Sequence, residues 1–439
     1  MYIKKVHLTN IRTISELEIT FPSPPGWHVL LGDNGAGKSS LIRAISAAII
    51  GPSEVLRLDP NFNTWVKNGE RKATINLWLE RDVQLDKRSG QGGAKAGVKD
   101  NTEVKCQTTI EQDEGNGRTW KFKDAFTKKD GLHPDYYNWG SGDGWFSAAF
   151  GPYRRFTGGD QSMEAFYIRN PKIGAHLTAF KENAALTESV IWLKDLQFRS
   201  LTKPNSEEAV ILKGIVHFTN QNNLLPYGFS LKEITPDGPL FSIPDGTEVH
   251  LYELSEGIKS VTSLAFELMR LLLRVYPADK VFRNFMDANQ DNDTVLVPGV
   301  VLIDEIDVHL HPSWQARIGK WFTRCFPQIQ FIVTTHSPII CRAAVNGSVW
   351  RLEVNESGIT TGRQLIGHEL DNLLFGDILD AFGTGAFGQD ILRDENGHQK
   401  LMRLAELNVL FYRGEATAKD KKERKQLLTI FPSNDSLLS

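Results

Sequence analysis

The chain has 439 residues, which allows two to three structural units and excludes a single small module. Hydrophobic residues make up 41% and charged residues 23%, an ordinary globular composition that argues against a fibrous or wholly disordered protein. The 50 basic and 53 acidic side chains give a net charge of −3, so no global positive field exists to hold a polyanion. Any contact with nucleic acid would be local or supplied by a partner.

The amino-terminal residues predict two strands within residues 2–20, joined by a turn at Asn10-Ile11-Arg12. A nearly continuous apolar strand follows at 27–31 and leads directly into the glycine-rich segment GDNGAGKSS. Apolar residues at helical spacing then predict a helix over 41–50, and residues 74–80 predict another strand. The order of these elements is strand, glycine loop, helix.

The middle of the chain changes in composition. Glycine-rich and polar segments between residues 87 and 144 predict loops and hairpins. Helices are then expected at 177–196 and 207–219, followed by short strands at 229–234 and 249–251.

Buried elements return after the segment LSEGIKS. A long apolar helix is expected to end before Pro277, and buried strands at 300–303 and 331–335 enclose a helix at 314–323. The last 60 or so residues are expected to be mostly helical, with the KDKKERK run on a solvated face.

The number of cysteines and the length of the apolar runs indicate the cellular location to expect. Cys106, Cys325 and Cys341 are too few and too scattered for a disulfide framework or a thiolate metal site, which predicts buried thiols in a reducing environment. The first residues lack a secretory signal, and no run approaches roughly 18 apolar residues. No membrane segment is expected, and the expected location is the cytoplasm.

Residues Gly32 to Ser39 match the phosphate-binding pattern G-x-x-x-x-G-K-[ST]. Glycines let backbone N–H groups converge on phosphate oxygens at a helix N-terminus. Lys38 would reach the β- and γ-phosphates of a nucleotide and Ser39 would ligate Mg²⁺. A plain glycine turn is disfavoured because the loop follows a buried strand and precedes a helix, so we expect ATP and Mg²⁺ as ligands.

Two further strands end in chemically useful residues. The apolar strand VVLI is followed by Asp304, which would hold the Mg²⁺ shell, and by Glu305, which would orient and polarise an attacking water. The strand FIVTT is followed by His336, at the rim where ligands of open α/β sheets bind. This histidine would contact the γ-phosphate, although in isolation a surface or capping histidine explains it better.

The segment Leu254-Ser255-Glu256-Gly257 opens the long apolar helix. A serine and a glycine at a free helix N-terminus would bind an anion, although an ordinary serine N-cap explains the segment better in isolation. Together with the P-loop, this second site suggests two chains arranged head to tail, each completing the nucleotide pocket of the other.

These motifs occur in the order found in ABC-type ATPases, and the sequence resembles that family. The opening L-T-N-I-R is similar to the SMC and RecF-like branch, and DEIDVHLHP with TTHSP is similar to the branch of OLD-type nucleases and bacterial anti-phage ATPases. The signature reads LSEGIKS rather than LSGGQ, which argues against a transporter head. No heptad arms separate the two halves.

The resemblance implies roles for particular residues. It implies Glu305, His336 and Lys38 in catalysis, Ser39 and Asp304 on Mg²⁺, and Asp307 at the dimer seam. It also implies nucleotide contacts from Arg12, Asn34, Gly35, Gly37, Lys38, Ser39 and Ser40, with Ser255, Glu256 and Gly257 acting on the opposite subunit. The region near WVKNGERKA, where the metal-linked glutamine is expected, contains no glutamine.

Softer segment matches point to one branch. GPYRRF, LLPYGFSLKEITPDG and the DILDAFGTGAFGQ tail resemble the ATPase subunit of Septu-type defence systems, including retron-linked ones, whose partner is an HNH nuclease. Arg154 and Arg155 are candidates for phosphate or partner contacts, although exposed arginines are usually only solvated. His309 and His311 are expected to be structural, because their spacing does not present two ligands on one helix face. No DxD pair for a TOPRIM nuclease follows His336.

The expected fold is an α/β, ABC-type P-loop ATPase head with a mixed sheet, a compact insert and a helical tail. The expected parts are a first ATPase lobe (1–85), an insert and helical subdomain (86–245), a second lobe (246–350) and a mainly helical region for assembly or partner binding (351–439).

The leading hypothesis is an ATPase that forms a homodimer or higher homo-oligomer around ATP and regulates an HNH-type nuclease partner in anti-phage defence, with nucleic acid bound through the complex. One alternative is a RecF-like repair ATPase that binds DNA itself. Another is a nucleotide-sensing scaffold that cages a toxic effector with little need for hydrolysis.

Overall fold

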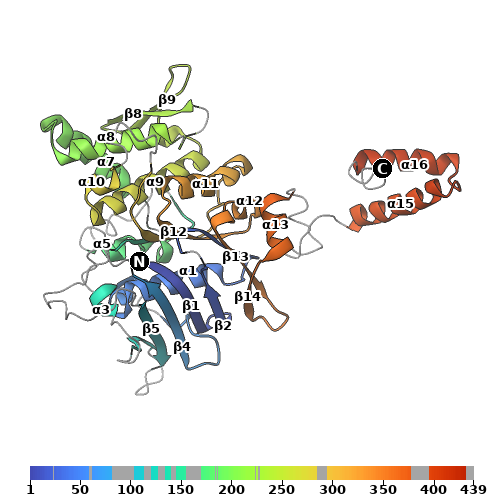
Figure 1. Cartoon of the computed structure of the whole chain (residues 1–439), viewed down its shortest axis with the longest axis horizontal. Coiled ribbons are helices and arrows are strands. Elements are labelled where there is room, and N and C mark those ends of the chain that lie inside the picture. Colours follow the sequence, from blue (N-terminus) through green and yellow to red (C-terminus); the bar gives the residue numbers. More distant parts are fainter. Residues whose placement is uncertain are drawn as a thin grey trace. The chain divides into compact units, whose positions relative to one another are not determined.

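The computed structural model describes residues 1–22, 24–58, 62–81, 103–112, 120–126, 134–139, 145–154, 170–182, 184, 186–222, 224–225, 228–283, 294–376 and 395–431. The chain divides into two compact units, Met1–Leu370 and Asp371–Ser439. Figure 1 shows the first unit as a large sheet accompanied by helices, and the second as a helical hairpin. No described helix is long and apolar enough to cross a membrane.

A mixed sheet forms the centre of the first unit. In chain order its strands are β1 (Tyr2–Ile11), β2 (Ile14–Thr20), β3 (Gly26–Gly32), β4 (Lys72–Glu80), β5 (Glu103–Gln112), β6 (Trp120–Asp124), β7 (Ser147–Phe150), β11 (Gly299–Ile303), β12 (Ile329–Thr335), β13 (Gly347–Val354) and β14 (Thr360–Gln364). Within the described residues their order across the sheet is β6-β5-β4-β1-β2-β14-β13-β3-β12-β11-β7. This arrangement confirms the expected α/β class with a mixed sheet.

The parallel part of the sheet positions the site. Strands β3, β12, β11 and β7 are neighbours and run in the same direction, so their carboxyl ends meet at one edge. Each is almost wholly buried, as continuous apolar runs such as VVLI require. The P-loop, the Asp304 turn and His336 follow three of these strands directly.

The remaining regular elements are mostly helices. They are α1 (Lys38–Ile50), α2 (Pro52–Leu58), α3 (Pro134–Tyr137), α5 (Pro171–Gly174), α6 (Leu177–Phe180), α7 (Thr187–Thr202), α8 (Glu207–Gln221), α9 (Glu256–Val275), α10 (Ala278–Val281), α11 (Pro312–Cys325), α12 (Pro338–Cys341), α13 (Gly367–Phe375), α15 (Glu395–Tyr412) and α16 (Ala418–Ile430). Short 3₁₀ helices occupy Leu251–Glu253 and Ala344–Asn346. A small sheet of β10 (Glu248–His250), β9 (Gly238–Ser242) and β8 (Ser230–Thr235) completes the first unit.

Alternate residues of the parallel strands contribute to two packing layers. Leu30, Leu302 and Ile332 join the apolar cluster that contains Leu41 and Ile45 of α1. At other strand positions, aromatic rings pack against α11. Trp27 stacks on Phe322, and the Phe331 ring is tilted against Phe322 and also contacts Phe326. Burying rings of this size is worth about 1.5–3 kcal/mol each, so both layers hold the sheet firmly.

Several boundaries differ from those expected. Residues 103–112, 120–124 and 147–150 are strands of the large sheet, so the region 86–245 is not a separate insert throughout. The region after 351 is not helical at its start, because β13 and β14 pair in the sheet through residue 364. Residues 347–354 and 360–364 form strands because β13 pairs with β3, which is distant in sequence. A local apolar pattern does not reveal such pairing.

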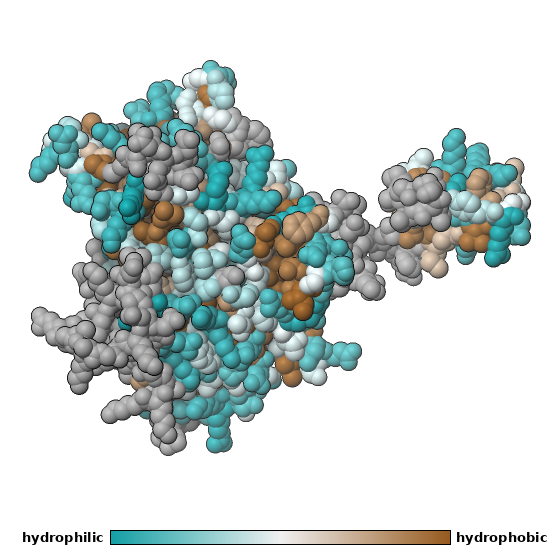
Figure 2. Space-filling view, in the orientation of Figure 1, coloured by the Kyte–Doolittle hydropathy of each residue, from teal (hydrophilic) through white to brown (hydrophobic). Residues whose placement is uncertain are grey.

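The first turn also lies later than expected. β1 continues to Ile11, and the chain reverses at Arg12 and Thr13. Arg12 adopts a left-handed backbone with φ 50°. Figure 2 shows a mainly hydrophilic surface interrupted by apolar patches, and the exposed hydrophobic residues of the first unit include Phe198, Leu201 and Ile366.

The second unit contains the helices α15 and α16. Its described core is small, consisting of Leu404, Leu407 and Leu427. The KDKKERK run lies on α16, where its lysines are exposed, as the sequence predicts for a solvated face.

Candidate nucleotide-binding site

The glycine loop joins β3 to α1 as the sequence predicts. Gly35 and Gly37 have positive φ angles of 82° and 84°, a conformation that residues with a Cβ rarely adopt. A Cβ on Gly32 would lie 2.4 Å from the carbonyl oxygen of Leu352, so the loop start also requires glycine for space. The loop therefore turns tightly into the N-terminus of α1, where helix N–H groups favour an anion.

A pocket of about 200 Å³ lies over this loop. It is lined by Arg12, Thr13, Asn34, Gly35, Gly37, Lys38, Ser39, Ser40 and Glu305. All of the residues that the sequence assigned to nucleotide contacts line it, together with the carboxylate expected to be the catalytic base. Thr13 lines it as well and was not anticipated.

Lys38 is folded back onto its own loop. Its Nζ donates to the carbonyl oxygens of Gly32 at 2.8 Å and Asp33 at 3.0 Å, and it lies 3.0 Å from Nε2 of His336. Burial lowers the pKa of Lys38, and the negative charges of Asp304 and other nearby carboxylates partly oppose that shift. The P-loop lysine and the late histidine, which are distant in sequence, therefore meet.

Arg12 reaches the pocket from the turn after β1. Its Nη1 donates to Ser40 Oγ at 3.2 Å, and its guanidinium lies 5.7 Å from the centre of the Trp65 ring. The Arg12 backbone N–H donates to the Trp65 carbonyl at 2.9 Å, which ties the turn to the segment that contains WVKNGERKA. This segment supports Arg12, a function that the sequence did not suggest.

The Asp304-Glu305 turn is fixed by the neighbouring strand. Thr334 Oγ1 donates to Asp304 Oδ1 at 2.6 Å and accepts the Glu305 N–H at 2.7 Å. Glu305 has a φ of 48°, a left-handed conformation that costs a non-glycine residue roughly 1–2 kcal/mol. The turn is therefore held in a strained shape that places Glu305 at the pocket and leaves Asp304 buried.

The following residues are ordered by a second threonine. Thr335 Oγ1 donates to Asp307 Oδ1 at 2.6 Å and accepts the Ser337 N–H at 2.9 Å. Because Thr334 and Thr335 are adjacent, one strand end orients two acidic side chains. The two threonines are visible in the sequence TTHSP. Only the pairing of the strands shows which carboxylates their hydroxyls contact.

The signature segment begins α9 and does not line the P-loop pocket of its own chain. Ser255 is exposed at the N-cap, where its side chain makes no capping hydrogen bond. Glu256 is exposed and pairs with Lys259 at 2.6 Å. A Cβ on Gly257 would lie 2.8 Å from the His309 carbonyl oxygen, so this glycine also serves packing within the chain.

Arg154 is not an exposed contact for phosphate or a partner, contrary to the sequence interpretation. It is 6% exposed, and its guanidinium donates to the carbonyl oxygens of Gly151 (2.9 Å), Asp304 (2.8 Å) and Glu305 (2.9 Å), and to Ser260 Oγ (3.3 Å). Burial lowers its pKa to about 10, which leaves it charged at neutral pH. Arg155 lies outside the described residues.

His311 and the cysteines have structural surroundings. His311 caps α11 by accepting the Ser313 N–H at 3.3 Å, which agrees with the structural role expected for it. Cys106, Cys325 and Cys341 are buried thiols outside any disulfide, as predicted.

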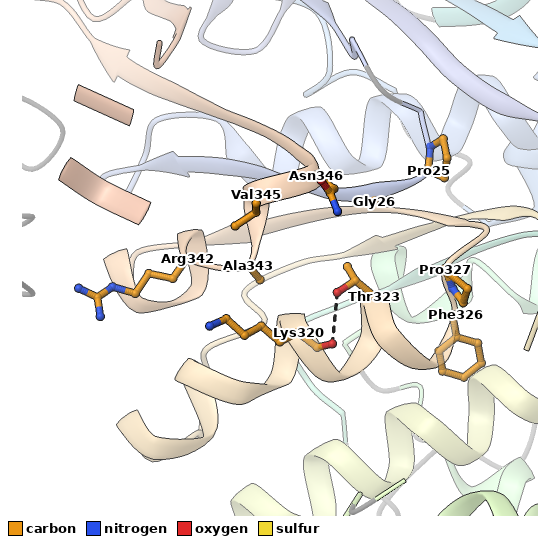
Figure 3. A pocket seen from close by; sticks show the side chains of 10 residues that line it. All are labelled: Pro25, Gly26, Lys320, Thr323, Phe326, Pro327, Arg342, Ala343, Val345 and Asn346. Atoms are coloured by element: carbon orange, nitrogen blue, oxygen red, sulfur yellow. Dashed lines mark hydrogen bonds between the residues drawn. The ribbon is translucent and has the colours of Figure 1, made fainter. Parts of the chain in front are cut away.

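A second described cavity, of about 250 Å³, lies elsewhere in the first unit. Figure 3 shows Lys320 and Thr323 of α11 on one side and Pro25, Gly26 and Asn346 on the other. None of the predicted site residues lines it. The residues predicted to bind the nucleotide line the P-loop pocket instead.

Comparison with known families identifies two segments. A family described as "AAA domain" matches residues 5–139, and one described as "AAA domain, putative AbiEii toxin, Type IV TA system" matches residues 178–342. The first contains the P-loop, and the second contains the signature segment, the Asp304 turn and His336.

Curated relatives include Septu proteins, retron probable ATPases and RecF replication and repair proteins. Septu protein PtuA of Bacillus mycoides (strain KBAB4) is 23% identical over 363 residues, covering 81% of this chain and 41% of the relative. Retron Vc95 probable ATPase of Vibrio cholerae serotype O1 biovar El Tor is 21% identical over 384 residues, covering 77% of this chain and 71% of the relative. The chain thus spans less than half the length of the Septu relative. The predicted resemblance to Septu and retron ATPases is confirmed.

Solved structures include SMC heads. The SmcHead bound to the C-winged helix domain of ScpA is 15% identical to this chain, with a TM-score of 0.47, and the match covers 84% of this chain and 99% of the other.

Proposed function

We propose that this chain, whose sequence resembles the ABC-type ATPases of Septu and retron defence systems, binds ATP with Mg²⁺, pairs head to tail with a second copy and hydrolyses the nucleotide. We propose further that this cycle regulates a partner nuclease. The main support is the pocket in which the P-loop, Arg12 and Glu305 meet. A phosphate cradle flanked by a carboxylate is the arrangement that hydrolysis of a nucleoside triphosphate requires.

The residues present fit a bound magnesium ion. Mg²⁺ prefers oxygen ligands, and the Ser39 hydroxyl lines the pocket while the Asp304 carboxylate is held in place by Thr334. These two side chains would hold the ion, which would neutralise charge on the β- and γ-phosphates.

The chain's own groups would perform the remaining tasks. Lys38 and Arg12 supply positive charge on two sides of the pocket, which suits the phosphates. Glu305 lines the pocket and would orient a water and accept its proton. His336 adjoins Lys38, and would contact the γ-phosphate once Lys38 moves to the nucleotide.

The signature segment supports the proposed dimer. Ser255 is exposed at the start of a long helix, and its hydroxyl is not used for capping, so it is available to a nucleotide held by another copy. Asp307, held by Thr335, would lie at the seam between the copies.

The test is the Glu305→Gln variant. We expect phosphate release to fall at least a hundredfold, because the amide cannot accept a proton from water. We also expect the mass measured with ATP to be that of a dimer, because the nucleotide persists between the copies. Lys38→Ala is the control and should stay at its nucleotide-free mass. Undiminished hydrolysis by Glu305→Gln would contradict the assignment of the base, and an unchanged mass would contradict the ATP-dependent dimer.

The partner requires a separate experiment. The chain would be co-expressed with an HNH-type nuclease, and DNA cleavage would be compared with ATP, a non-hydrolysable analogue and no nucleotide. Regulation by hydrolysis predicts that the analogue fixes the nuclease in one state. If the nuclease is released by loss of the nucleotide alone, without hydrolysis, the scaffold alternative is correct. DNA binding by the chain alone, with a steep salt dependence, would support the RecF-like alternative.

A further inference from the structure

Arg154 joins two parts of the site that lie far apart in sequence. Three of its contacts are carbonyl oxygens, those of Gly151 after β7 and of Asp304 and Glu305 after β11. The fourth is Ser260 Oγ, which belongs to the signature helix α9. A single buried guanidinium therefore contacts both the catalytic turn and the helix that begins with Ser255.

The contacts to the catalytic turn matter because that turn is strained. Glu305 has a left-handed backbone, and Arg154 donates to the carbonyl oxygens of the two peptides that flank this residue, those of Asp304 and Glu305. Hydrogen bonds from a charged donor are among the stronger ones in proteins, and two of them offset the strain of one such residue. The position of Glu305 in the pocket thus depends on where Arg154 lies.

The contact to α9 ties Arg154 to the signature segment. Ser260 is 5% exposed and lies in the first part of α9, whose residues from Ser260 to Leu272 are buried. A helix packed in this way moves as a rigid body. A shift of Ser255 would therefore be transmitted to Ser260 and from there to the Arg154 guanidinium.

We propose that Arg154 is a positioning residue that couples the signature helix to Glu305, so that the catalytic carboxylate is set for hydrolysis only when α9 is engaged by the partner's nucleotide. This inference rests on the proposed function, because it needs an ATP-dependent dimer. It gives a direct route from the start of α9 to the catalytic carboxylate of the same chain.

Ser260→Ala tests the coupling with little disturbance of the fold. The substitution removes the α9 acceptor and leaves the carbonyl contacts of Arg154 intact. We expect ATP affinity and the ATP-dependent dimer to change less than about threefold, while kcat at saturating dimer falls at least about tenfold, the lower limit for loss of one hydrogen bond to a charged group. The matched control is Ser263→Ala, because the buried Ser263 hydroxyl donates to the Ser260 carbonyl and does not contact Arg154. This control should keep the wild-type kcat.

A double-mutant cycle separates coupling from independent damage. Arg154→Lys keeps the charge but cannot span the four acceptors. If both residues act through their contact, the double variant will hydrolyse ATP no more slowly than Arg154→Lys alone. Multiplied effects would overturn the proposal. If Arg154→Lys does not fold, equal kcat for Ser260→Ala and Ser263→Ala would overturn it equally well.

Measurements on the wild-type protein distinguish failure of the proposed function from failure of the coupling proposal. If it neither hydrolyses ATP nor dimerises with it, the proposed function is wrong and the coupling proposal falls with it. If it does both and the Ser260→Ala variant matches wild type, only the coupling proposal is wrong.

Discussion

Lys38 Nζ and His336 Nε2 lie 3.0 Å apart, although the two residues are separated by 298 positions in the sequence. A protonated lysine can only donate, so the imidazole nitrogen facing it must be the acceptor. The same lysine also binds two carbonyl oxygens of its own loop. A nucleotide phosphate must compete with all three groups, which makes this cluster a barrier to binding.

His336→Ala removes one of these competitors. A net hydrogen bond is worth about 0.5–1.5 kcal/mol, so we expect ADP to bind about two- to tenfold more tightly than to wild type. ATP should gain less, because the variant also loses the expected contact with the γ-phosphate. Titration calorimetry with each nucleotide measures the difference. Equal gains for ADP and ATP would argue against a γ-phosphate contact, and weaker ADP binding would argue against competition.

Thr334→Val removes a hydroxyl without changing the size of the side chain much. Asp304 loses a donor at 2.6 Å and the Glu305 N–H loses its acceptor at 2.7 Å. Leaving such groups unsatisfied costs about 1–3 kcal/mol each. We expect a lower free energy of unfolding and a severalfold higher Mg²⁺ concentration for half-maximal hydrolysis, measured by denaturant titration and by phosphate release.

Thr335→Val is the matched control for that experiment. Its hydroxyl serves Asp307 and the Ser337 N–H rather than Asp304. Its Mg²⁺ requirement should stay near that of wild type, while the ATP-dependent dimer weakens. A Mg²⁺ requirement that rises equally in both variants would mean that the effect of Thr334→Val is general damage to the strand end.

A buried histidine predicts an acid-sensitive fold. His176 Nδ1 lies 2.7 Å from Ser46 Oγ of α1, and its Nε2 lies 3.0 Å from Ser147 Oγ of β7. Burial lowers the pKa of His176 to about 3 from 6.5. Between these values the unfolded chain binds a proton that the folded chain does not, so stability falls as the pH decreases from 6.5 towards 3, by about 1.4 kcal/mol per pH unit.

Urea unfolding at pH 7.5, 6.0 and 5.0 measures this dependence. The His176→Gln variant can hydrogen-bond with the two serines but has no proton to gain in this range. It should be less stable than wild type at pH 7.5 and should lose about 1.4 kcal/mol less per unit below pH 6. Parallel pH profiles for the two proteins would show that His176 is not responsible.

Site residues that lie in short continuous motifs could be predicted from the sequence, whereas the residues that support them could not. The P-loop, the Asp304-Glu305 turn and His336 each follow a buried apolar strand, and parallel pairing necessarily brings such strand ends together. The support of these residues was missed. Thr334 and Arg154 act through contacts that depend on register and burial, and an isolated arginine in GPYRRF is read as exposed.

The same reason explains the error at residue 351. β13 is a strand because it pairs with β3, which lies more than three hundred residues earlier, and β14 then pairs with β13 and β2. Local composition carries little of that information. The helix α9 was predicted well, by contrast, because its apolar residues repeat at helical spacing and Pro277 follows its end.

The head-to-tail arrangement predicts that two inactive variants restore one another. Lys38→Ala disables the P-loop of its own chain, and Ser255→Arg disables the signature segment that serves the other chain. A mixed dimer then contains one site with an intact P-loop and an intact signature. Equal amounts that mix randomly should recover about a quarter of wild-type hydrolysis, since half of the dimers carry one working site.

Lys38→Ala mixed with Glu305→Gln is the control for this rescue. Both residues line the same pocket of one chain, so every mixed dimer has a defect in each of its two sites and should stay inactive. Phosphate release from both mixtures, measured at the same total protein concentration, provides the comparison. Rescue in both mixtures, or in neither while each Ser255→Arg chain still binds ATP, would show that Ser255 does not act on the nucleotide of a second copy. Rescue in the first mixture alone requires that each pocket be built from two chains, because no single chain in that mixture has both parts intact.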